Sequence, residues 1–172
     1  MVSWKNSKGV LGTVVLFGVV WFVHPAQDRV NELEEQISTQ YTYANPLLRD
    51  TVKDLLEYDF SEPLTDENEE DFNRLTKEFW NVIGLFFSED TVHSEWQDRV
   101  DDTKIYFMNF ASGSPLSEEE AADFYQVLKA TRLISRDLRD YTKQSEFYDA
   151  MHSEDHEMVE QVKKRLAWKY KD

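Results

Sequence analysis

The sequence predicts an all-α protein with a single N-terminal transmembrane helix, a stalk helix and an antiparallel helical bundle. Apolar residues recur at intervals of three and four along most of the chain, which is the spacing of an amphipathic helix. One uncharged apolar run lies near the N-terminus, and no stretch alternates apolar and polar residues long enough to predict a strand. Short turns between the predicted helices favour antiparallel neighbours that bury their apolar stripes against one another.

Composition narrows the class of protein further. The chain has 172 residues, no cysteine and a formal net charge of −15. Without cysteine, disulfides, thiolate zinc sites and iron–sulfur clusters are excluded. Residues 28–102 hold 21 acidic and six basic residues, and such an acidic section repels phosphate backbones, so no nucleic-acid partner is expected. A solvated surface is the simpler explanation of this charge, and a docking face for a basic partner or for cations is the alternative.

Residues 9–27 are predicted to form the transmembrane anchor. The strongly apolar part, residues 10–23, is shorter than the roughly 20 residues that span a bilayer, but aromatic residues and Lys8 at its ends extend it. A cleaved signal peptide is the alternative interpretation. It is less favoured because the best cleavage point, after Ala26, places His24 where a small residue is preferred.

The cations around the anchor predict its orientation. Lys5 and Lys8 precede it, whereas the residues that follow are mostly acidic. The positive-inside rule therefore places residues 1–8 in the cytoplasm and the large domain in the periplasm or an equivalent extracytoplasmic space.

Residues 28–44 are predicted to form a stalk helix that continues from the membrane. Val30, Leu33 and Ile37 give it a narrow apolar stripe on an otherwise charged stretch. Asn45-Pro46 predicts a break, after which residues 45–172 form the acidic helical bundle domain.

Within the bundle, a short amphipathic helix is expected after residue 46. The acidic stretch that follows, residues 58–70, is expected to begin as a loop and to end in the start of the next helix. The next helix starts near Thr65 or Asp66 and carries a dense aromatic stripe over residues 72–87. The stripe predicts core packing, and an alternative assigns Trp80 and Phe87 to a partner-binding groove.

Three further helices complete the predicted bundle. Ser88 or Asp90 caps a continuous helix that reaches Phe110, and the turn at residues 111–115 ends it. Ser117 and Glu120 then form a capping box that opens a long helix. The last helix begins near Ser153.

One group of residues has the types that bind a metal. On a continuous helix Asp149, His152 and His156 share one face, so a carboxylate and two imidazoles could converge on a zinc ion. A helix start at Ser153 would break that face, and an exposed polar turn is the simpler interpretation. His93 is expected to be a surface or hydrogen-bonded histidine.

The C-terminal residues combine basic charge with Trp168 and Tyr170. Cations in the last turns of a helix interact favourably with its dipole, which is the simpler explanation. The alternative is that this segment, with Trp168, contacts the acidic section, a partner or lipid headgroups.

No nucleophile, phosphate loop or paired carboxylate motif predicts a reaction, so neither an enzyme nor a cofactor is expected. The sequence instead predicts a single-pass membrane protein that serves as an accessory or scaffold subunit and binds a protein partner in a membrane or envelope complex. An extracytoplasmic module that binds a ligand or metal is the alternative.

Overall fold

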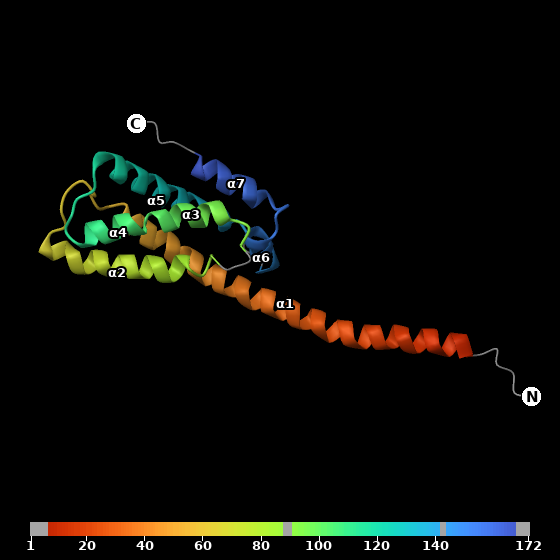
Figure 1. Cartoon of the computed structure of the whole chain (residues 1–172). Coiled ribbons are helices and arrows are strands. Elements are labelled where there is room, and N and C mark those ends of the chain that lie inside the picture. Colours follow the sequence, from red (N-terminus) through yellow and green to blue (C-terminus); the bar gives the residue numbers. More distant parts are fainter. Residues whose placement is uncertain (1–6, 88–90, 142–143, 168–172) are drawn as a thin grey trace, which may run out of the picture.

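The computed structural model describes the backbone of residues 7–87, 91–141 and 144–167, and the side chains of residues 28–87, 91–141 and 146–167. Within these ranges every regular element is a helix, which confirms the predicted all-α helical bundle (Figure 1). The helices are α1 (Ser7–Leu55), α2 (Asp66–Ile83), α3 (Ser94–Asp102), α4 (Lys104–Ala111), α5 (Glu118–Leu138), α6 (Gln144–His152) and α7 (Glu157–Leu166).

Two long helices, α1 and α5, lie antiparallel at the centre of the bundle. Just before α5 begins, the amide of Leu116 donates to the carbonyl of Phe60, which follows the end of α1, over 2.8 Å. Near the end of α5, the side chain of Asn45 on α1 donates to the carbonyl of Ser135 over 2.9 Å. The two contacts fix opposite ends of the pair, and the remaining helices pack around it.

Helix α1 has 49 residues and, at about 1.5 Å per residue, is roughly 70 Å long. Only its C-terminal part lies in the bundle, and the rest projects away from it (Figure 1). Burial begins at Ser38 and continues through Tyr41, Ala44 and Leu48, so part of the predicted stalk is packed within the bundle.

The predicted helix break at Asn45-Pro46 is wrong, because α1 runs through both residues. Pro46 has no amide to donate to the carbonyl of Thr42, but both residues are exposed, so water can bind that carbonyl. Asn45 is buried instead, and it is held by Ser135, whose hydroxyl donates to its side-chain oxygen over 2.6 Å. The division of the chain at residue 45 into two domains stays a prediction.

Aromatic side chains fill the core, as the stripe on α2 predicted. Phe72, Leu75, Phe79, Val82, Ile83 and Phe86 are all buried. Phe60 is fully buried as well, and its ring centroid lies 5.0 Å from that of Phe110 and 4.6 Å from that of Phe124. Helix α2 begins at Asp66 after Thr65, as predicted.

The helix predicted to end at Phe110 is divided in two. Helix α3 begins at Ser94, later than expected, and Thr103 separates it from α4. The Thr103 hydroxyl donates to the carbonyl of Val100 over 2.6 Å, and its amide donates to the same carbonyl over 3.0 Å. The predicted caps, Ser88 and Asp90, lie outside the described residues.

The start of α5 is confirmed in detail. The amide of Glu120 donates to the Ser117 hydroxyl, and the amide of Ser117 donates to the Glu120 carboxylate, which completes the capping box. The last helix begins at Glu157 rather than near Ser153. A separate helix that the sequence did not predict, α6, precedes it.

Candidate functional site

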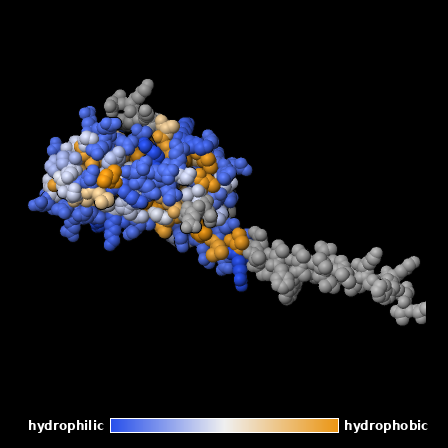
Figure 2. Space-filling view, viewed as in Figure 1, coloured by the Kyte–Doolittle hydropathy of each residue, from blue (hydrophilic) through white to orange (hydrophobic). Residues whose placement is uncertain are grey.

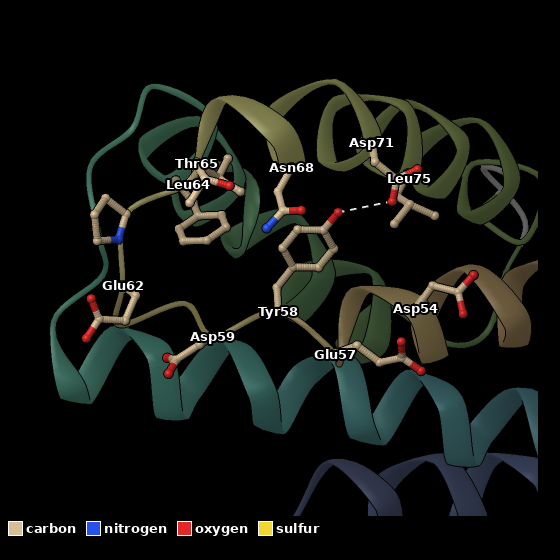
Figure 3. A pocket seen from close by; sticks show the side chains of 12 residues that line it. Asp54, Glu57, Tyr58, Asp59, Glu62, Leu64, Thr65, Asn68, Asp71 and Leu75 are labelled. Atoms are coloured by element: carbon tan, nitrogen blue, oxygen red, sulfur yellow. Dashed lines mark hydrogen bonds between the residues drawn. The ribbon is translucent and has the colours of Figure 1, made fainter.

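A pocket of about 600 Å³ opens where α1 is connected to α2 (Figure 3). This connection lies at the end of the bundle away from the projecting part of α1 (Figure 1). Leu64, Leu75 and Phe110 supply apolar lining. Its polar rim is acidic, and five carboxylates contribute: Asp54, Glu57, Asp59, Glu62 and Asp71. The acidic stretch over residues 58–70 was visible in the sequence, but the pocket that its loop forms with the first turns of α2 was not.

Tyr58 lies across this end pocket and connects the loop to α2. Its hydroxyl donates to Asp71 over 3.1 Å, as Figure 3 shows. Burial, and then this hydrogen bond, raise the pKa of Tyr58 to about 12. Arg74 donates to Asp71 over 2.6 Å and is the main cause of the lowered pKa of that carboxyl. Tyr58 therefore stays a neutral donor beside an ionised carboxylate.

Asp59 is also held ionised, because it accepts hydrogen bonds from the hydroxyl and amide of Ser61 over 2.6 and 3.0 Å, which lower its pKa. Glu57 and Glu62 extend the negative charge along the rim. Opposite charge is favoured near such a rim, so the arrangement can accept a cationic group such as a lysine or arginine side chain of another protein.

A second surface lies on α1 where the helix leaves the bundle. The apolar stripe that is buried from Tyr41 onward continues toward the N-terminus as Ile37, Leu33 and Val30. Ile37 is half-buried, but Leu33 is 57% exposed and Val30 is 45% exposed. Figure 2 shows the hydrophobic side chains gathered on α1 at the edge of the bundle. We call Val30 and Leu33 the exposed stripe.

The predicted metal ligands make other contacts. His152 ends α6, and its Nε2 shares a hydrogen bond with the hydroxyl of Tyr41 over 2.9 Å. His156 precedes α7, and its Nδ1 accepts from the amide of Met158 over 3.1 Å. Asp149 is exposed. No three histidine or carboxylate side chains among the described residues are grouped closely enough to hold a metal, and the assignment of these three to an ion stays a prediction.

The predicted partner-binding aromatics are partly buried against the core. The Trp80 ring lies edge-on to Phe107 at 5.5 Å, and the Lys104 ammonium lies 5.2 Å from its centroid. Phe87 lies edge-on to Trp96 at 5.0 Å. Both residues retain some exposure, and their role in partner binding stays a prediction. Trp168 lies outside the described residues.

Among the helical residues with described side chains, none forms a helix long and apolar enough to cross a membrane. The side chains of the predicted anchor, residues 9–27, lie outside that part of the chain, as do residues 1–6 altogether. Comparisons with models of protein families, with curated protein sequences and with solved structures gave no match, so the functional argument depends on the residues of this chain.

Proposed function

We propose that the protein is an accessory or scaffold subunit of a membrane or envelope protein complex. In this proposal residues 9–27 anchor it, residues 1–8 lie in the cytoplasm, and the bundle binds its partner on the extracytoplasmic side. The single observation that carries the proposal is the exposed stripe, which continues a buried helical stripe beyond the edge of the bundle.

The exposed stripe is suited to a helix of another protein. Val30 and Leu33 are three residues apart and lie in line with Ile37, so a partner helix laid along α1 would contact all three. Complete burial of one such side chain contributes about 1.5 to 3 kcal/mol. An isolated apolar side chain on a surface is ordinary, but a stripe that continues from a core is a ready-made contact surface.

The flanking charges indicate the chemistry of the partner. Asp28, Glu32, Glu34 and Glu35 surround the exposed stripe, and Arg29 is the one cation among residues 28–37. A second copy of this helix would bring acidic flanks together, which is unfavourable. We therefore propose a partner helix with an apolar stripe between lysine or arginine residues, and the end pocket offers a second acidic surface to the same class of partner.

Site-specific photocross-linking in native membranes tests this proposal. A photoreactive amino acid at Leu33 is expected to capture one protein of defined mass. The matched control carries the same group at Glu35, which is exposed and about 200° around the helix from Leu33, and it is expected to capture much less. Equal capture at both positions, or cross-linking only to a second copy of the chain, would contradict the proposal.

A further inference from the structure

A groove lined by cations lies between α1 and α5 on this acidic protein. Five basic side chains line it, Arg49, Lys129, Arg132, Arg136 and Arg139, together with Leu56 and Leu133. The space measures about 610 Å³, and none of the lining residues is acidic. We call it the basic groove. Its charge contrasts with the net charge of −15 on the whole chain.

The order of residues on α5 explains why the cations gather. Lys129, Arg132 and Arg136 follow one another on α5 at intervals of three and four, so they lie along one face of the helix. Arg139 follows three residues after Arg136, as the residue that caps the end of α5. Arg49 approaches from α1, which packs antiparallel to α5. The leucines contribute an apolar surface between the charged side chains.

Three of the five cations of the basic groove form ion pairs with neighbouring residues in the sequence. Arg49, Arg136 and Arg139 each contact the acidic residue next in sequence, with N–O distances of 3.3, 3.3 and 3.9 Å. The Arg49–Asp50 and Arg139–Asp140 pairs join largely exposed side chains and contribute about 0 to 1 kcal/mol each, so a ligand can replace them. Within the described part of the chain, no ion pair involves Arg132.

Arg136 can turn to a ligand without leaving a buried carboxylate unpaired. The side chain of its neighbour Asp137 is only 11% exposed, and its second oxygen accepts from Arg165 on α7 over 2.7 Å. This second contact persists when Arg136 moves. The Arg136 side chain is itself 50% exposed, so its movement requires no change in the core.

We propose that the basic groove binds a small ligand that carries several phosphate groups. The guanidinium group of an arginine can donate two parallel hydrogen bonds to two oxygens of one phosphate. Several cations in one groove can therefore bind more than one phosphate group. A volume near 600 Å³ is within the range of small-molecule sites. The negative charge of the whole chain repels long polyanions, whose charges extend beyond the groove, more than it repels a compact ion.

Calorimetric titration of the full chain in neutral detergent with tripolyphosphate tests the proposal. The double variant Arg132→Gln and Arg136→Gln is expected to bind at least tenfold more weakly than the unmodified protein. The control, Lys163→Gln and Lys164→Gln, removes the same charge from exposed positions on α7 and is expected to leave the affinity within twofold. Thermal melts of both variants confirm that the bundle is retained.

A second titration distinguishes the source of the phosphate. Glycerophosphoglycerol, a soluble lipid headgroup, is expected not to displace tripolyphosphate at millimolar concentration if the ligand is a soluble polyphosphate. Displacement would assign the groove to the single phosphate of a lipid headgroup and would overturn the proposal of a ligand with several phosphates. Equal loss of affinity in both double variants, or no binding to the unmodified protein at physiological salt, would overturn the proposal, whereas failure of the Leu33 cross-link would not affect it.

Discussion

Acidification is expected to destabilise the bundle through His93. This side chain is only 3% exposed, and its Nε2 donates to the carbonyl of Ala150 on α6 over 2.7 Å. Burial lowers the pKa of His93, and the nearby His152 and His156 add to the effect, although the bond to Ala150 opposes it. The neutral imidazole is therefore the form that fits the fold.

The sign and the upper limit of the effect follow from proton linkage. An unfolded chain binds a proton at His93 with a pKa near 6.5, whereas the folded chain binds it at a lower pH. Below pH 6.5 the unfolded state therefore holds more protons, and the free energy of unfolding falls as the pH falls. Between pH 7.5 and 5.5 the loss due to this group is at most about 1.4 kcal/mol.

Urea unfolding at both pH values, followed by tryptophan fluorescence, measures this loss in the unmodified protein and in His93→Gln. The glutamine retains a donor for the carbonyl of Ala150 but does not titrate. The unmodified protein is expected to lose up to about 1.4 kcal/mol more than the variant, since contributions from the other histidines cancel in the comparison. Identical pH dependence in the two proteins, or a smaller loss in the unmodified protein than in the variant, would refute the reasoning.

Two further substitutions test the packing by the same urea assay. Ser117→Ala removes half of the capping box of α5 and is expected to lower the free energy of unfolding by about 1 kcal/mol, while Ser117→Asp, which retains an acceptor, loses much less. An equal loss in both would mean that the cap is not the cause. The hydroxyl oxygen of Thr76 is buried and has no hydrogen-bond partner within the described residues, so Thr76→Val is expected to be neutral or stabilising by up to about 1 kcal/mol; a clear loss would show that the hydroxyl is bonded.

Patterns among neighbouring residues were sufficient to predict part of the fold. The capping box of α5 involves residues three apart, and the stripe on α2 repeats over several turns, so both could be read from neighbouring residues. The division at Thr103 could not, because Trp96, Val100, Thr103 and Phe107 keep the same helical spacing across it.

The failed prediction at Asn45-Pro46 has a long-range cause. A proline after an asparagine is a local signal for a turn. The partner of Asn45 is Ser135, 90 residues later in the sequence, and no local pattern identifies that pair. The same holds for the basic groove, since Arg49 joins the cations of α5 only when the two helices pack. Sites formed by residues from separate helices are therefore the features of this protein that are hardest to predict from its sequence.

The unbroken course of α1 sets the direction in which the bundle faces. A hinge at residue 45 would have let the domain turn freely about its tether, but a continuous helix relates every face of the bundle to the N-terminal end of α1. One residue inserted between residues 28 and 37 would rotate the bundle by about 100° and lift it by about 1.5 Å, whereas seven residues would lift it by about 10 Å and nearly restore its heading. The length of α1 thus determines which face of the bundle a partner at a fixed position would contact.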